Sequence, residues 1–223
     1  MSVMDNRNTV KGWKYCVIAL LAFAGLGLEV LIGLVIEPVL YGVQMGEWNT
    51  WQNIIHWIIT CIVWGIVTYF LIRYSKKKYE FDLFKKAEPM KMWQWIAVAA
   101  CIAFSLVVSF MDWNGSKVLK EFYYNGWLKF IFQYIYYMFE TALFMLIIVF
   151  GQKAFEKWFQ SDKIPYGGIA VALTWGLVHT FTKGSIASGL ISALGGFLFG
   201  VVYLLVNRDI KKTYLLLLIM FVL

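Results

Sequence analysis

The chain is poor in charged residues: only 15% of its 223 residues are Asp, Glu, Lys or Arg, whereas 61% are hydrophobic. A soluble domain of this length would carry roughly a quarter charged residues. The deficit excludes an ordinary soluble domain and predicts an all-α fold, a polytopic bundle of transmembrane helices. Because the sequence has no internal repeat and no low-complexity segment, we expect a single integral membrane domain over residues 1–223.

Cysteine is scarce as well. The three cysteines, Cys16, Cys61 and Cys101, lie in apolar stretches and form no CxxC pair or Cys/His spacing. They predict neither a disulfide framework nor a metal site, and we expect them to pack as small apolar residues. No cofactor is predicted. The net charge of +7 does not form a basic stripe between aromatic residues, so no nucleic-acid partner is predicted either.

What the chain does have is long apolar runs. A transmembrane helix needs about 20 apolar residues, and six full spans are predicted, followed by a short apolar helix that is too short to cross unaided. The spans are 15–41, 51–74, 93–111, 129–151, 164–182 and 185–206, and the short helix is 213–223. The first run is too long for a signal-peptide core and lacks a convincing cleavage site, so we expect it to be retained.

The basic residues set the expected orientation. Of the 20 Lys and Arg residues, 16 lie in the N-terminal tail, the loops 73–92 and 152–163, and the turn 207–212. This bias predicts that the N-terminus and these loops are cytoplasmic. We interpret the richest stretch, 73–91, as a topology signal with some contact to the lipid bilayer.

Two polar residues stand out inside the predicted spans. Glu140 lies near the middle of the fourth, and His179 lies in the last turns of the fifth. A charged group costs a few kcal/mol in hydrocarbon, so such residues face a protein or water-filled interior and are candidates for function. A structural role is the alternative for each. Glu140 would then hydrogen-bond Tyr136 or Tyr137, and His179 would bond a neighbouring carbonyl or hydroxyl.

His179 follows Trp175 by four residues, so the two side chains share one face of a helix. In the sixth predicted span, Gly196 and Gly200 form a GxxxG pattern that allows close helix approach. Close packing there would bring the sixth span against the Glu140/His179 pair.

The other histidine, His56, lies early in the second span near Trp51 and Trp57, and we interpret it as an interfacial residue. Together with Glu140 and His179 it would supply ligand types that suit zinc. The chain has no HExxH motif or other tight ligand spacing. No metal site is therefore predicted.

Two carboxylates lie in the first span, Glu29 and Glu37. They are candidates for an ion or proton relay. Because Pro38 follows Glu37, we expect Glu37 to lie at a helix end near water, which weakens that interpretation.

The segments Glu140-Thr-Ala-Leu-Phe-Met145 and Trp175-Gly-Leu-Val-His179 carry a family resemblance. They resemble the glutamate motif and the FxxxH motif of the CAAX protease and bacteriocin-processing (Abi) family. The resemblance covers about residues 123–223, including the Gly-rich stretch 195–205. It implies an intramembrane endopeptidase in which Glu140 is the general base and His179 its partner. By the same resemblance Trp175 and Thr182 would contact a membrane-associated peptide or protein substrate, in a bacterial cytoplasmic membrane.

The chain departs from the family pattern at several positions. Thr141 stands where the family has a second Glu, and Met145 where it has an Arg. The His and Asn of a third motif, thought to stabilise the oxyanion, would fall near Leu217 and Phe221. Loss of one oxyanion donor costs about 10²–10³ in rate. The residues that could substitute are His56, Asn207 and Thr182.

Three functions therefore compete. The first is the endopeptidase. The second is a catalytically silent family member that binds a peptide, confers immunity or supports a partner protein. The third is a small-substrate transporter subunit that uses Glu29, Glu37 or Glu140.

Overall fold

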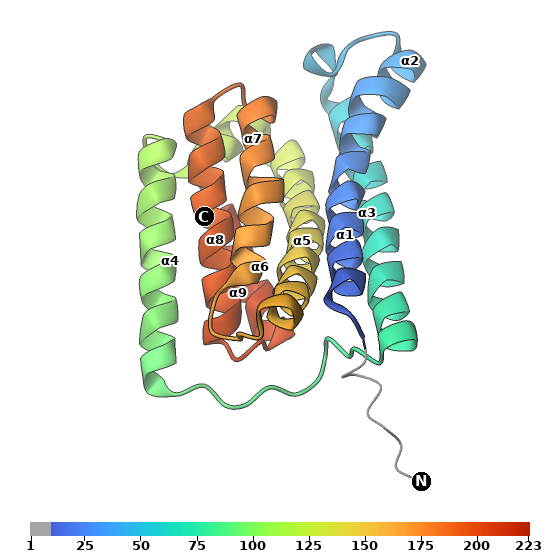
Figure 1. Ribbon diagram of the computed structural model, residues 1–223. Coiled ribbons are helices and arrows are strands. Elements are labelled where there is room, and N and C mark those ends of the chain that lie inside the picture. The colour runs from blue at the N-terminus through green and yellow to red at the C-terminus, as the bar shows by residue number, and fades with distance from the viewer. Residues whose placement is uncertain (1–9) are drawn as a thin grey trace.

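The computed structural model describes residues 10–223, and this part of the chain is helical with no strand. Figure 1 shows the arrangement of its elements. The α-helices are α1 (Gly12–Leu31), α2 (Glu37–Tyr41), α3 (Thr50–Tyr79), α4 (Met92–Asp112), α5 (Lys117–Phe159), α6 (Tyr166–Val171), α7 (Leu177–Thr182), α8 (Ile186–Leu205) and α9 (Ile210–Val222). Two π-helical turns, η2 (Ile32–Ile36) and η4 (Ala172–Gly176), continue α1 into α2 and α6 into α7, and η3 (Met45–Glu47) is a 3₁₀ turn.

Five helices in this range are long and apolar enough to cross a membrane, which agrees with the predicted class of helical membrane bundle. They are Gly12–Tyr41, Thr50–Tyr79, Met92–Asp112, Lys117–Phe159 and Ile186–Leu205. The segment predicted as the fifth span, 164–182, is helical from Tyr166 to Thr182 through α6, η4 and α7, and is shorter than these five.

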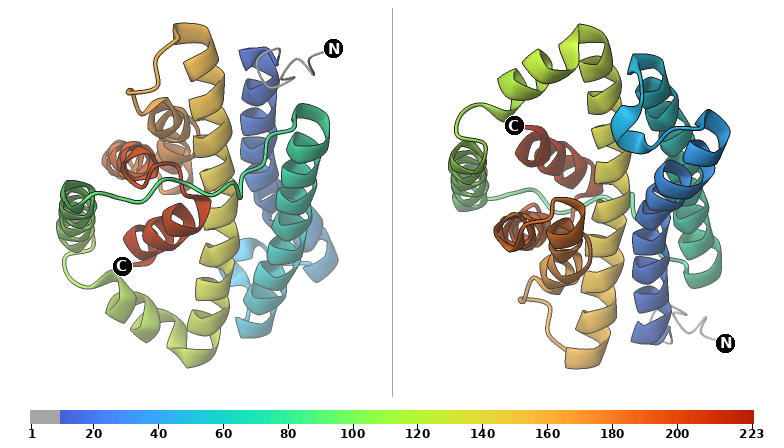
Figure 2. Two further views of the ribbon diagram at one scale, coloured as in Figure 1. Left: turned by 90° about the horizontal axis from the view of Figure 1, so that it is seen from below. Right: turned by 90° about the horizontal axis from the view of Figure 1, so that it is seen from above.

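Helix α5 is the central element. It packs against α1 and α3 on one side and against α6 and α9 on the other, as the end-on views in Figure 2 make visible. Its segment 143–150 is almost fully buried, so the core lies along this helix. The predicted fourth span, 129–151, lies within α5, which extends beyond it at both ends, and Gly126, with φ 68° and ψ 168°, interrupts the outer turns of the helix.

Glycine residues bring the α6–α7 segment and α8 into close contact. A Cβ on Gly200 would overlap the backbone of Gly168, and a Cβ on Gly196 would lie 3.2 Å from the Cα of Ala172. The GxxxG pattern therefore does mark a close helix approach, as predicted. It fixes the position of the segment that carries Trp175 and His179.

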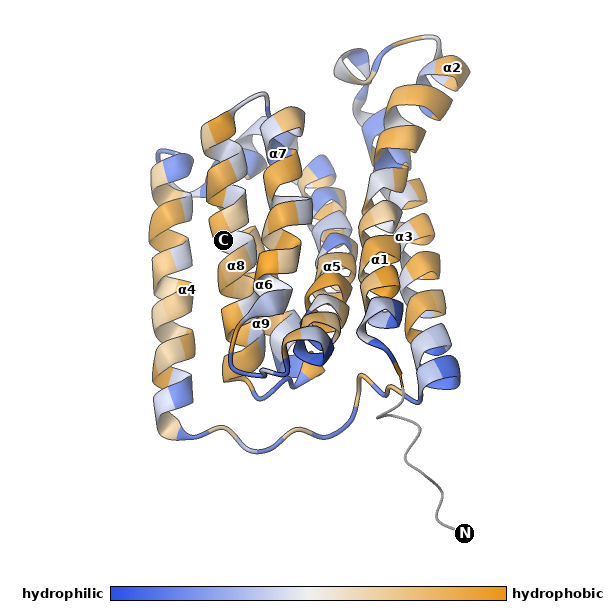
Figure 3. Cartoon of the chain, viewed as in Figure 1, coloured by the Kyte–Doolittle hydropathy of each residue, from blue (hydrophilic) through white to orange (hydrophobic). Residues whose placement is uncertain are grey.

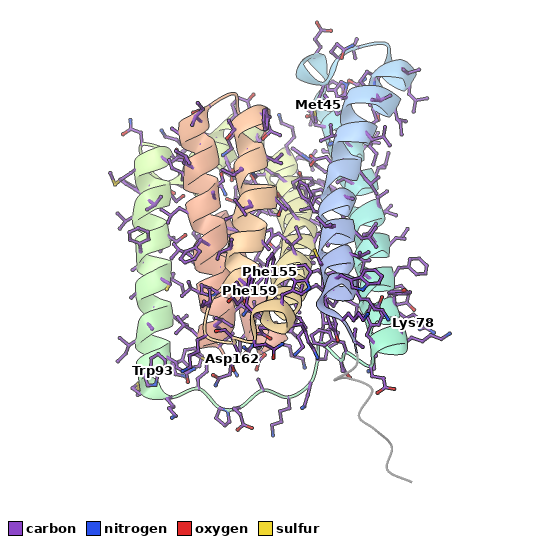
Figure 4. The ribbon with its side chains drawn as sticks, viewed as in Figure 1. Met45, Lys78, Trp93, Phe155, Phe159 and Asp162 are labelled. Carbon is purple, nitrogen blue, oxygen red and sulfur yellow. The ribbon has the colours of Figure 1, made fainter. Side chains whose placement is uncertain are left out.

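Hydrophilic residues gather at the two ends of the bundle in Figure 3, including the 80–91 loop at its lower end. By sequence, this loop and the 73–79 turns before it hold seven of the basic residues. Figure 4 shows Lys78, Trp93 and Asp162 at this lower end and Met45 at the opposite, upper end. The chain begins α3 at the upper end because Asn49 and Gln52 form a capping box, in which the Asn49 side chain accepts from the Gln52 backbone N–H at 3.0 Å.

Candidate functional site

A cavity of about 440 Å³ lies between α1–η2 on one side and α5 and η4–α7 on the other. Met45, at the upper end of the bundle, also lines it, so the cavity reaches toward that end. Most of its wall is apolar. Its polar and aromatic hydrogen-bonding residues are Glu29, Trp64, Tyr136, Glu140, Trp175, His179 and Thr182.

Glu140 lies on α5 and is only 9% exposed. Its Oε1 accepts a hydrogen bond of 2.8 Å from the indole Nε1–H of Trp175. A buried carboxyl group needs such a partner, because burying an unsatisfied polar group costs free energy. Trp175 thus fixes the orientation of Glu140 at the cavity wall. The predicted structural alternative, a bond to Tyr136 or Tyr137, is wrong: their hydroxyls donate to Glu29 and Glu121 instead.

His179 is oriented by the same tryptophan. Its Nδ1 lies 2.8 Å from the backbone oxygen of Trp175, and the two rings meet edge to face with centroids 4.6 Å apart. A carbonyl oxygen can only accept a hydrogen bond, so Nδ1 carries the proton. In the neutral imidazole Nε2 is then an acceptor.

Trp175 and His179 also line a second, smaller cavity of about 110 Å³ that faces α4, α8 and α9. The pair therefore forms a wall between two cavities. Lys117 and Lys183 lie in the lining of the smaller one. Thr182, which was predicted with Trp175 as a substrate contact, lines the larger cavity and is exposed. Glu140, Trp175, His179 and Thr182, the four site residues predicted from the sequence, thus all line the larger cavity.

The sequence did not predict that Glu29 shares this cavity. Glu29 lies on α1, and its Oε1 accepts a hydrogen bond of 2.7 Å from the hydroxyl of Tyr136. It is the second carboxylate of the site, opposite Glu140. Only its position inside an apolar span could have suggested this, because a sequence does not show which helices pack together.

The expectation that Glu37 lies near water was wrong. His56, expected near the membrane interface, is buried inside the protein with only 1% of its surface exposed. Glu37, expected near water, is also 1% exposed. The Nδ1 of His56 lies 2.5 Å from Glu37 Oε2, and its Nε2 lies 3.6 Å from Glu29 Oε1. The Glu29, Glu37 and His56 side chains therefore form one cluster, in which His56 and Glu37 are buried and Glu29 is half-buried at the cavity wall.

Aromatic and aliphatic side chains occupy the positions that correspond to the third family motif. Leu217 is fully buried, and the ring of Phe221 lies 5.5 Å from those of Trp175 and Phe144. Neither side chain can donate a hydrogen bond. Within residues 10–223, no group of three His, Cys, Asp or Glu side chains is arranged to hold a metal ion.

Comparison of the chain with protein-family models, with curated proteins and with solved structures gave no match.

Proposed function

We propose that the chain is an intramembrane endopeptidase that cleaves a membrane-associated peptide or protein tail. One observation carries the proposal: the indole N–H and backbone carbonyl of Trp175 orient a carboxyl group, Glu140, and an imidazole, His179, at the wall of one cavity. A positioned carboxylate and an imidazole acceptor are the groups needed to activate water. The resemblance of these two segments to the CAAX protease family supplies the class of reaction.

In this mechanism Glu140 accepts a proton from the attacking water while the water oxygen bonds to the peptide carbonyl carbon. His179 Nε2 accepts a hydrogen bond from the other O–H of that water and so aims the water oxygen at the carbonyl carbon. Glu140 then returns the proton to the amine nitrogen as the carbon–nitrogen bond breaks. Trp175 is a positioning residue in this scheme, and Thr182 contacts the substrate at the exposed end of the cavity.

The test compares Glu140→Gln and His179→Ala with the unmodified chain in proteoliposomes that hold a membrane-anchored peptide. Each variant should lose cleavage by about 10²–10⁴-fold, the usual contribution of a general base. The matched control is Glu121→Gln, a buried carboxyl bonded by Tyr134 and Tyr137 that does not line this cavity. Cleavage that survives in Glu140→Gln would contradict the proposal.

A second function, that of a catalytically silent peptide binder, is favoured by Leu217 and Phe221. They leave apolar side chains where the family resemblance would put oxyanion donors. In that case the unmodified chain binds the peptide without cutting it. Glu140→Gln would then bind the peptide as tightly as the unmodified chain, measured by fluorescence anisotropy of a labelled peptide in nanodiscs.

We further propose six spans, with Tyr166–Thr182 crossing as well, and a cytoplasmic N-terminus in a bacterial cell membrane. The clustering of basic residues at the end of the bundle that carries the 80–91 loop supports this orientation. The close packing of Gly168 on Gly200 supports a membrane crossing by Tyr166–Thr182, because α6 packs beside α8, which is itself long and apolar enough to cross.

A further inference from the structure

The π-helical turn η2 aligns two carboxylates on the first span. Glu29 and Glu37 are eight residues apart, which in a regular α-helix would put them about 80° apart around the axis. A π-turn accommodates one extra residue, so Glu37 is carried back toward the face of Glu29. Both carboxylates thereby meet the same side chain, His56 of α3.

His56, on α3, is enclosed by the turn η2 and by Trp48. Its ring lies 5.2 Å from that of Trp48, and a Cβ on Gly33 would lie 3.0 Å from its Cε1. Nδ1 contacts Glu37 at 2.5 Å. Nε2 faces Glu29 at 3.6 Å but has no hydrogen-bond partner in the described part of the chain. A buried imidazole nitrogen without a partner costs free energy, so its position calls for a role beyond packing.

The cluster connects the upper end of the bundle with the cavity. The hydroxyl of Tyr41, which is half-buried, lies 3.4 Å from Glu37 Oε1. From there the contacts run through His56 to Glu29, whose Oε1 also accepts from Tyr136. Glu29 and Tyr136 line the cavity that holds Glu140. No step of this path leaves the protein.

We propose that Glu37, His56 and Glu29 form a proton relay between the upper surface and the cavity. Glu37 takes up a proton from the surface side and passes it to Nδ1 of His56. His56 releases its other proton from Nε2 to Glu29, and rotation of the ring then returns the imidazole to its starting state. No bond other than O–H and N–H bonds changes, and the net result is one proton moved. An imidazole suits this role because it has two distinct nitrogens.

The role of the relay rests on the proposed endopeptidase function. Peptide cleavage needs a proton for the leaving amine, and Glu29 would hold one beside Glu140. The geometry of the relay, however, does not depend on catalysis. The experiment that tests it therefore uses no substrate.

The chain holds only two histidines, so nitrogen-15 histidine labelling of the full chain in lipid nanodiscs gives an NMR spectrum with two imidazoles. The His179→Gln variant assigns them. The relay predicts that both ring protons of His56 exchange with deuterated water, and that Glu37→Gln slows both by about a hundredfold or more, the usual effect of removing a positioned proton-transfer group. Glu29→Gln should slow the Nε2 proton in the same way.

His179 serves as the internal control, because its Nδ1 donates to a backbone carbonyl and its exchange should not change in Glu37→Gln. Exchange at His56 that is unchanged in both Glu37→Gln and Glu29→Gln would overturn the relay. Separate, non-exchanging Nδ1 and Nε2 signals in the unmodified chain would overturn it too. Slowed exchange together with absent peptide cleavage would keep the relay and reject the proposed function.

Discussion

The two histidines of the chain lie in opposite electrostatic surroundings. His56, on the side of α1 and α3, lies between the carboxylates of Glu29 and Glu37. His179, on the side of α6 to α9, has the backbone oxygen of Trp175 as its hydrogen-bond partner at Nδ1. A pair of carboxylates stabilises a charged imidazole, whereas a single carbonyl fixes a tautomer. The first arrangement suits the movement of protons, and the second suits an acceptor that faces a cavity.

Both regions use a π-helical turn to place their groups. The turn η2 brings Glu37 toward the face of Glu29, and η4 carries Trp175 against Glu140. Such turns are rare in proteins, and those that occur are often found at functional sites. That the two π-turns within residues 10–223 both border the same cavity shows that the two halves of the bundle converge on it.

The largest effect should follow from breaking the carboxylate–imidazole cluster. Glu37→Leu leaves His56 buried with one partner fewer, and removal of one member of a buried ion pair costs about 3–5 kcal/mol. We expect that loss in the free energy of unfolding in detergent micelles. Glu37→Gln, which keeps the shape and one oxygen, should lose less. A Glu37→Leu variant as stable as Glu47→Leu, an exposed control, would contradict the buried pair.

The next largest effect concerns the packing that positions the other histidine. Gly200→Leu places side-chain atoms where the backbone of Gly168 lies, and overpacking costs about 3 kcal/mol at the upper end of its usual range. Gly195→Leu is the matched control on the same helix, because no atom of residues 10–223 lies within 4 Å of a Cβ there. Thermal unfolding of both variants measures the difference. Equal midpoints would mean that α6 and α8 do not pack as described.

A smaller effect should distinguish the role of Trp175 in orienting Glu140 from its contribution to the stability of the fold. Trp175→Phe removes the indole N–H and leaves Glu140 Oε1 without its donor, at a cost of about 2 kcal/mol. Trp64→Phe removes a comparable bond of 2.9 Å to the backbone oxygen of Gly25, also beside the cavity. Both should lower the unfolding midpoint similarly. Only Trp175→Phe should reduce the turnover rate for a membrane-anchored peptide, and equal turnover in both would reject its positioning role.

The sequence predicted the class of fold and part of the site for physical reasons. Apolar runs identify spans because the bilayer penalises exposed polar groups, and a buried Glu or His is costly wherever it lies. The outer turns of α5, from Lys117 to residue 128, were missed because they are rich in polar and charged residues. Hydropathy alone cannot separate such a helical extension from a loop.

The cluster around His56 could not be predicted in the same way. Its members are Glu29, Glu37 and His56, and their meeting depends on η2, where one extra residue turns the helix. A π-turn leaves no periodic pattern in the sequence. Pro38 predicted that Glu37 lies at a helix end near water, but the chain stays helical to Tyr41 and Glu37 is buried. By contrast, Trp175 and His179 are four residues apart, a spacing that the sequence shows directly.

The last prediction perturbs the fold least and tests which face of the membrane the cavity approaches. Lys183 is exposed in the turn between α7 and α8, close to His179, whereas Lys85 is exposed in the basic 80–91 loop at the other end. With Cys16, Cys61 and Cys101 replaced by Ala, Lys183→Cys should react with a membrane-impermeant maleimide added to intact cells. Lys85→Cys should react only after the cells are permeabilised.

Neither change should alter stability measurably, because exposed surface substitutions stay within about 0.5 kcal/mol. The reverse labelling pattern would put the basic loops outside. The relay would then take its protons from the cytoplasm, although the contacts between Glu37, His56 and Glu29 would be the same.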